Sequence, residues 1–289
     1  MRKLLFIVAL FVLAGIVYGE EATVIPKQHL RLTMNNYFGV HDDGGFVSRG
    51  YGAEYGVANW LNLQLMWNQF VKLYPDFGSS SVFLGAKAYI FGGEGAFASA
   101  FRILEDGDLL PVGQKLRLSG AFGILIPPAD SKPDLRDQDQ QLWGSSLRLY
   151  GDFVVKDYFY INAYFEGVFY PPQYQNDNLE EYRDWVRHYQ DFTFELEAHF
   201  EFPVKDVILK FGAPIRYFCA PYMNASDEFA TSQYFLSLGT YFGVKFDERE
   251  PPVEMYIKYS TFLIGQNIEQ THWFSFVGRV TLPPIKRAD

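Results

Sequence analysis

Beyond its first twenty residues the chain alternates apolar and polar positions over long stretches. In residues 192–202 every even position is apolar and every odd position is polar, with Glu195, Glu197 and Glu201 among the polar ones. A strand places alternate side chains on opposite faces, so this segment has one apolar and one charged face. Strands of soluble proteins are typically about 5–6 residues long, whereas a tilted strand needs about 9–11 residues to cross a bilayer. The pattern therefore predicts a membrane-spanning strand.

The same alternation recurs along the chain in thirteen segments. Single-chain bacterial barrels have an even number of strands. Either 82–91 and 96–104 do not both form strands, which gives twelve, or a strand is missing, which gives fourteen; we expect twelve. The segments are 30–38, 48–56, 60–73, 82–91, 96–104, 115–126, 142–155, 158–170, 192–202, 207–217, 233–245, 253–263 and 272–282.

The connections between these segments differ in length. Residues 56–59, 156–157 and 203–206 form short connections, whereas 127–141, 171–190 and 218–232 are long and rich in Asp, Pro, Asn and Gln. Outer-membrane barrels have short turns at one end and long loops at the other, and lipid offers no partner for an open sheet edge. We therefore predict an all-β fold, a closed antiparallel transmembrane β-barrel. A soluble β-sandwich or jelly roll, which also alternates, is the competing fold.

The start of the chain indicates export. Arg2 and Lys3 precede an apolar stretch from Leu4 to Val17, and Gly19 follows as a small residue at a cleavage position. We expect residues 1–19 to be a cleaved signal peptide and residues 20–289 to form a single barrel domain in a bacterial outer membrane. The expected partners are the lipid bilayer, lipopolysaccharide and the outer-membrane assembly machinery.

Composition agrees with a barrel in lipid. Aromatic residues make up 18% of the chain, and the net charge of −9 argues against nucleic-acid binding because no basic surface is available for phosphates. Cys219 is the one cysteine, so the chain has no internal disulfide. Aromatic side chains near strand ends suit the interfacial girdles of a membrane barrel. These candidates are Trp60, Trp143, Tyr158, Tyr170, Tyr234 and Trp273.

If the apolar faces meet lipid, the opposite faces line a lumen in which cations and anions are nearly balanced. This wall favours a polar conduit; the alternative is a closed interior filled by ion pairs. Tyr158, Tyr160 and Tyr164 would form a column along which an aromatic molecule could move, or belong in part to the girdle. The candidate transport residues are Arg31, Lys87, Arg117, Arg148, Asp152, Tyr160, Tyr164, Glu166, Glu195, Glu197, His199, Glu201, Lys210, Arg216 and Lys258; Glu54, Glu254 and Arg279 share the same face.

No signature of catalysis accompanies this wall. The chain contains no phosphate-binding loop, no HExxH and no GxSxG, and its histidines are scattered. Acidic connections, such as those containing Asp42 and Asp43 or Asp134 and Asp137, suit divalent cations, but a run of charge is more often a solvated face. We therefore expect no enzyme activity, no cofactor and no dedicated metal site.

Two stretches resemble the transporter-like outer-membrane barrels associated with meta-pathway phenol degradation, distant relatives of the long-chain fatty-acid transporters. Residues 54–63 are similar to that family's strand, tight turn and strand beginning with a tyrosine-glycine pair, here Tyr55 and Gly56. Residues 116–127 are similar to its glycine-bearing strand that ends at proline, although Pro128 stands where a glycine is usual. The resemblance implies passive uptake of hydrophobic or aromatic small molecules.

Taken together, these observations predict an outer-membrane channel or passive transporter for small molecules. The alternative is a structural or adhesive barrel with a filled, non-conducting interior. The last segment has an apolar face that includes Phe274 and Phe276, but residues 283–289 follow it. The signal for membrane insertion is therefore expected to be internal.

Overall fold

The computed structural model describes residues 22–41, 44–72, 77–91, 115–126, 144–156, 158–169, 187–188, 190–223, 231–246, 251–266 and 270–284. Nearly all of these residues belong to strands, as the long period-two pattern predicts. The strands are β1 (Leu30–His41), β2 (Gly44–Ala58), β3 (Leu61–Lys72), β4 (Phe77–Phe91), β5 (Lys115–Ile126), β6 (Gly144–Lys156), β7 (Phe159–Phe169), β8 (Arg187–His188), β9 (Gln190–Val204), β10 (Val207–Met223), β11 (Thr231–Phe246), β12 (Val253–Gln266) and β13 (His272–Leu282).

The strands form one sheet that closes on itself. Each long strand pairs antiparallel with the next long one, β7 pairs with β9, and β13 returns to pair with β1. The two-residue β8 pairs only with the end of β10. Among the described residues the wall therefore has twelve long strands, which confirms the predicted number. Segment 82–91 is part of β4, whereas segment 96–104 lies outside the described residues.

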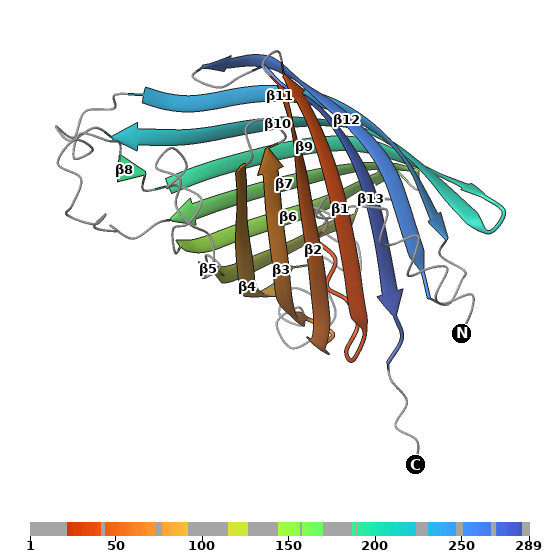
Figure 1. Ribbon diagram of the computed structural model, residues 1–289. Helices are drawn as coiled ribbons and strands as arrows, with labels where there is room; N and C mark the ends of the chain where they lie inside the picture. The colour runs from red at the N-terminus through yellow and green to blue at the C-terminus, as the bar shows by residue number, and fades with distance from the viewer. Residues whose placement is uncertain are drawn as a thin grey trace.

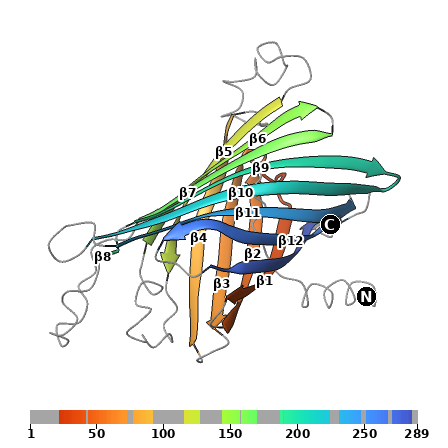
Figure 2. The ribbon, with the colours of Figure 1, turned by 90° about the horizontal axis from the view of Figure 1, so that it is seen from above.

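Opposite walls of the barrel cross steeply. In Figure 1 β1, β2 and β3 run at a large angle to β6, β7 and β9, and Figure 2 shows the same crossing from above. Strands of a closed barrel tilt by about 35–45° from its axis, so front and back walls cross at about twice that angle. The twisted sheet closes into a barrel because β13 pairs with β1 in continuous register.

Connections of different length gather at opposite ends of the barrel. Residues 59–60 and 205–206 are short turns at one end, here called the turn end, where β6 also connects to β7 through two residues; β5 and β7 end at the other, the loop end. The long stretches 127–143 and 170–186 follow these two strands. The asymmetry has exceptions: 92–114 follows β4 at the turn end, and at the loop end only 42–43 separate β1 from β2 and only 73–76 separate β3 from β4. The predicted connection 218–232 is too long, since β10 continues to Met223.

The two faces of the wall have the predicted character. On β9 Phe194 and Leu196 point outward with 48% and 55% of their surfaces exposed, whereas the inward-pointing Glu195 and His199 are each 5% exposed. Large apolar side chains therefore cover the outside and charged ones fill the inside. No helix among the described residues is long and apolar enough to cross a membrane.

One predicted girdle residue lies elsewhere. Trp273 shares the inward face of β13 with Ser275 and Arg279, and its ring packs against Phe262. The prediction of an interfacial Trp273 is therefore wrong. The residue is near a strand end, but it lies on the inward-facing set of alternate positions of β13. Tyr158 lies in a turn and is exposed, as expected, while Trp143 and Tyr170 lie outside the described residues.

Candidate functional site: the charged and aromatic lumen

The structure places the predicted lumen residues on the inner face of the wall. Their alternation with outward apolar neighbours holds on every strand that carries them, and many are almost completely buried. They form three groups of contacts, of which the second and third share Glu254. These inward residues are Arg31, Lys87, Arg117, Arg148, Asp152, Tyr160, Tyr164, Glu166, Glu195, Glu197, His199, Glu201, Lys210, Arg216 and Lys258.

One group centres on a buried ion pair between β6 and β7. Arg148 Nε donates to Glu166 Oε1 at 2.7 Å, and the Ser146 and Tyr164 hydroxyls each donate to the same carboxylate at 2.8 Å. The Arg148 guanidinium lies 3.9 Å from the ring centroid of Phe83. A buried charge pair is tolerated only when its remaining hydrogen-bonding capacity is satisfied, and this one is satisfied on both sides.

A second group lies near the turn end on β9 and β10. His199 stands between two carboxylates, with Nδ1 3.3 Å from Glu197 Oε1 and Nε2 3.5 Å from Glu201 Oε1. Lys210 Nζ lies 2.8 Å from Glu201 Oε1 and 3.9 Å from Glu254 Oε1. Cations and carboxylates alternate across neighbouring strands here, so the group is an ion-pair network.

A third group links the seam where β13 meets β1. Arg279 donates to Glu254 at 2.8 Å, and Arg31 lies 3.6 Å from Glu54, which also accepts a hydrogen bond of 2.7 Å from Gln64. The void enclosed beside this group has a volume of only about 10 Å³, room for about one water molecule. Side chains therefore pack closely around this group.

The chain before the first strand also enters the lumen, which the sequence did not predict. In residues 22–29 the Ala22 amide donates to Asp152 Oδ1 at 2.9 Å, and Ala22 is fully buried. The side-chain amide of Asn62, oriented to satisfy both bonds, donates to Ile25 O at 3.2 Å and accepts from Ile25 N at 3.0 Å. Polar groups of the inner wall thus pair with the backbone of this segment, which we call the N-terminal segment.

Gly56 on β2 permits this close approach. A Cβ atom at this position would collide with the carbonyl oxygen of Pro26. The backbone of Gly56 instead bonds to the segment on both sides, accepting from Gln28 N at 2.6 Å and donating to His29 O at 3.0 Å. Only a residue without a side chain can bring two backbones this close. The glycine of the tyrosine-glycine pair quoted above therefore anchors the N-terminal segment.

A pocket of about 270 Å³ opens in the lumen toward the loop end. Its apolar wall includes Phe235 and Trp273, and its charged side includes Glu195, Arg216 and Lys258. Sequence reasoning found the three charges but missed both aromatic residues, because apolar side chains occur on both faces of β11 and β13 near this end. The sequence did carry a signal for Trp273: it lies an even number of residues from Ser275 and Arg279 on the same strand, so all three side chains share the inward face.

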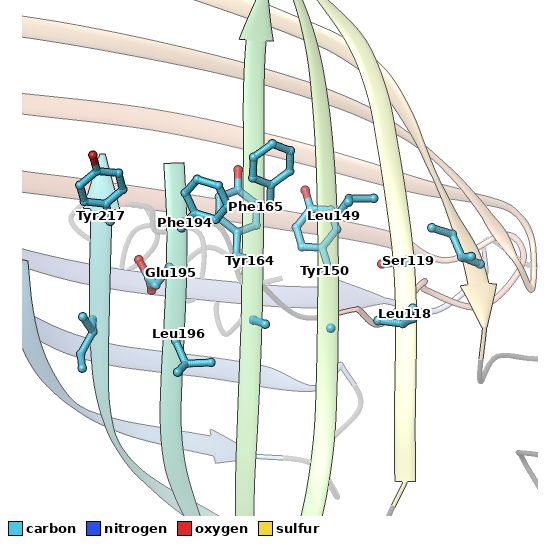
Figure 3. Close-up of a pocket in the computed structure, with 14 residues that line it drawn as sticks. Leu118, Ser119, Leu149, Tyr150, Tyr164, Phe165, Phe194, Glu195, Leu196 and Tyr217 are labelled. Atoms are coloured by element: carbon cyan, nitrogen blue, oxygen red, sulfur yellow. The ribbon is translucent and has the colours of Figure 1, made fainter. Parts of the chain in front are cut away.

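The outer wall carries an apolar depression of about 580 Å³ across β5, β6, β7, β9 and β10. Gly151 and Ala163 form its shallow floor because their side chains are small. Figure 3 shows Leu149, Phe165 and Phe194 on successive strands around it. Its lining is almost entirely apolar, so the depression faces the same surroundings as the rest of the outer wall.

The candidate cation-binding loops lie outside the described residues. Asp42, Asp43, Asp134 and Asp137 are among them. Within the described ranges no three His, Cys, Asp or Glu side chains converge in a group that could hold a metal ion.

Comparison with known proteins informs the fold. No protein-family model matches the chain, and a search of curated proteins finds no match. An outer-membrane channel from Pseudomonas putida F1 aligns over 93% of this chain and 100% of its own, with a TM-score of 0.62 and 9% identity. LpxR from Salmonella typhimurium aligns over 88% of this chain and 99% of its own, with a TM-score of 0.42 and 9% identity. The CymD monoaromatic hydrocarbon channel aligns over 89% of each chain, with a TM-score of 0.37 and 10% identity. Both are too dissimilar to support an argument. The chain thus has the fold of an outer-membrane channel barrel.

Proposed function

We propose that the protein is an outer-membrane channel or passive transporter for small molecules, hydrophobic or aromatic ones among them. The observation that carries the proposal is the division of the wall: outward residues such as Leu196 and Ile264 are apolar and exposed, and inward ones such as Glu195 and Lys87 are charged and buried. An apolar outer wall suits lipid, and a closed sheet satisfies its backbone without water. Outer-membrane channels combine an apolar outer wall with a polar interior in this way.

Location and assembly follow from the same proposal. The chain is exported by the signal peptide of residues 1–19, which lie outside the described residues, and the assembly machinery inserts it among bilayer lipids and lipopolysaccharide. The resemblance to the meta-pathway barrels adds the preference for hydrophobic or aromatic molecules. Gly56, which belongs to the tyrosine-glycine pair of that resemblance, is structurally required here.

The aromatic preference has support inside the lumen. Phe235 is 4.6 Å from Phe262 and 5.6 Å from Trp273, measured between ring centroids, and the pocket beside them is large enough for a single ring. Ligand sites are typically concave, largely apolar and supplied with a few polar groups, which describes this pocket. Tyr160, stacked on His199 at 4.9 Å, presents a further ring inside the barrel.

A specific observation favours the alternative of a filled, structural barrel. The N-terminal segment bonds to the inner wall, Arg148 and Glu166 form an ion pair inside the lumen, and the void beside Arg31 and Glu54 measures only about 10 Å³. In a channel this packing is a constriction that must widen during passage. In a structural barrel it is permanent and stabilises the wall.

Uptake into vesicles separates these functions. Purified protein is incorporated into lipid vesicles, insertion is confirmed by a heat-dependent change in gel migration, and swelling in small neutral and aromatic solutes is compared with protein-free vesicles. The proposal expects faster swelling with protein, and faster for the smaller solutes. Swelling no faster than that of protein-free vesicles in every solute would favour the filled barrel.

A further inference from the structure

The outer face of the barrel carries a cation in the body of its apolar wall. On β2 the outward positions alternate with the inward Glu54, and the outward set includes Tyr51 and Arg49, both exposed. Among the side chains that the structure describes, Arg49 is the one Asp, Glu, Lys or Arg that points outward from the body of a long strand; Lys156 is the last residue of β6. A charge on a lipid-facing wall is destabilising unless it lies near a polar boundary or pairs with an opposite charge.

Two amide side chains flank this arginine in register. Arg49 lies opposite Asn36 on β1 and opposite Gln69 on β3, and Figure 1 shows the three strands side by side. Opposite side chains on one face of an antiparallel pair lie about 4.5–5.5 Å apart between their Cβ atoms. The three side chains therefore form a compact group of hydrogen-bond donors, which we call the polar row. Neither register partner is a carboxylate, so the charge of Arg49 is not balanced within the row.

Apolar side chains border the polar row in both directions along the strands. Toward the turn end Tyr51 stacks on Trp67, with ring centroids 5.4 Å apart, and both residues are exposed. Toward the loop end Phe38 and Val40 of β1 are also exposed. The row is therefore a polar patch enclosed by apolar surface, and it differs from a solvated rim, in which polar residues continue to the ends of the strands.

The polar row lies in the loop-end half of the wall. Arg49 is in the first half of β2 (Gly44–Ala58), which begins at the loop end, and Gln69 is in the last half of β3 (Leu61–Lys72), which ends there. The long loops of outer-membrane barrels are external, so this half of the wall faces the outer leaflet in the proposed location. The lipid of that leaflet is lipopolysaccharide, whose membrane anchor carries phosphate groups.

We propose that the polar row binds a phosphate group of lipopolysaccharide. The Arg49 guanidinium pairs with the phosphate through charge-assisted hydrogen bonds, and the amides of Asn36 and Gln69 donate to its remaining oxygens. Acyl chains of the same molecule pack against the exposed rings of Tyr51 and Trp67. The charge of the arginine and that of the phosphate are complementary, and the apolar border matches the acyl chains. The inference rests on the outer-membrane location in the proposed function and adds a binding site for a lipid on the outer wall.

Native mass spectrometry of the full-length protein in a maltoside detergent tests the assignment with lipid A as probe. Dephosphorylated lipid A, which keeps the acyl chains without the anion, and phosphatidylglycerol, which keeps a phosphate without the lipid A sugars, are the comparison probes. We expect lipid A to bind at least about tenfold more tightly than dephosphorylated lipid A, since the phosphate pairs with Arg49. Equal affinities for these two would overturn the proposal. An affinity for phosphatidylglycerol equal to that for lipid A would overturn the choice of lipopolysaccharide.

Variants separate phosphate recognition from general attraction to a cationic surface. Arg49→Gln should weaken lipid A binding about tenfold and leave the binding of dephosphorylated lipid A unchanged. Gln69→Leu removes one amide donor and should weaken lipid A binding only about threefold. Lys156→Gln, at the exposed turn-end terminus of β6, removes a cation outside the row and is the matched control. Equal losses in Arg49→Gln and Lys156→Gln would show that binding follows total charge, which overturns the site.

A measurement of stability provides a second readout. Each variant is first checked for folding by heat-dependent gel migration, so a loss of binding is not a loss of the barrel. Lipid A should raise the midpoint temperature of that migration change more for the unmodified protein than for Arg49→Gln, because a ligand of the folded state stabilises it more strongly the higher its affinity. An equal rise in both proteins would contradict the site.

The outcome is independent of transport. If Arg49→Gln keeps the full affinity for lipid A, the site is overturned even when vesicles swell as the proposed function expects. Selective binding of lipid A without vesicle swelling supports the site and contradicts the channel.

Discussion

Gly56 shows how a single residue connects the wall with the chain inside it. Its missing side chain leaves space for the Pro26 carbonyl, and its backbone bonds to the N-terminal segment on both sides. The sequence marked this glycine only through a resemblance, since a glycine in a strand has several possible reasons. The lumen charges were easier to predict, because the parity of Glu195 or Lys210 follows directly from the alternation.

Gly56→Ala should destabilise the barrel and loosen the N-terminal segment. The new methyl group meets backbone, which cannot move aside as a flexible side chain would, so the expected loss in free energy of unfolding is about 1–3 kcal/mol. Denaturant titration in lipid vesicles, read by gel migration, measures it. Gly52→Ala is the control on the same strand, because its Cβ would lie 3.7 Å from Thr33, an ordinary contact. Equal stability of the two variants would show that the segment is not held at Gly56.

Arg148→Met should be among the most destabilising single changes in the lumen. It leaves the partly buried Glu166 carboxylate, 18% exposed, without its cation, which costs up to about 3 kcal/mol of unfolding free energy. The double variant Arg148→Met with Glu166→Gln removes both charges and should recover a large part of that loss. A double-mutant cycle by denaturant titration gives the coupling energy. Strictly additive effects would contradict an interacting pair.

At the scale of the element, β9 shows what a strand pattern can and cannot establish. Its alternation predicted the inward and outward faces of 192–202 correctly, but the strand extends to Gln190 and Val204, because pairing with its neighbours continues past the regular pattern. On β11 and β13 the pattern is weaker near the loop end, where rings lie on both faces. There the inward position of Phe235 and Trp273 depends on register across the sheet, which a single segment does not reveal.

A charge on the outer face of β9 should be costly in proportion to its depth. Leu196→Arg lies near the middle of the strand and should reduce the free energy of folding into vesicles by about 2–4 kcal/mol. Phe202→Arg lies two residues from the end of the strand at Val204 and should cost only about 0–1 kcal/mol by the same measurement. Equal costs at both positions would contradict a membrane centred on the middle of the strands.

At the scale of the whole molecule, the closed wall was predictable and its contents were not. Long alternation, together with the even-number rule, indicated twelve strands, and the pairing of β13 with β1 closes them. The N-terminal segment could not be predicted, because residues 22–29 have no periodic pattern and their position depends on distant partners such as Asp152 and Asn62. The filling of the lumen is therefore a tertiary property, and it decides whether the barrel conducts.

Single-channel recording in planar lipid bilayers tests the central claim most directly. The full-length protein is compared with a variant that lacks residues 22–28 and keeps residues 1–21. If the barrel is a channel narrowed by its N-terminal segment, the full-length protein gives small discrete conductance steps, and the variant gives steps several-fold larger. Silence in both, with insertion confirmed by heat-dependent gel migration, would contradict the channel and establish the filled barrel.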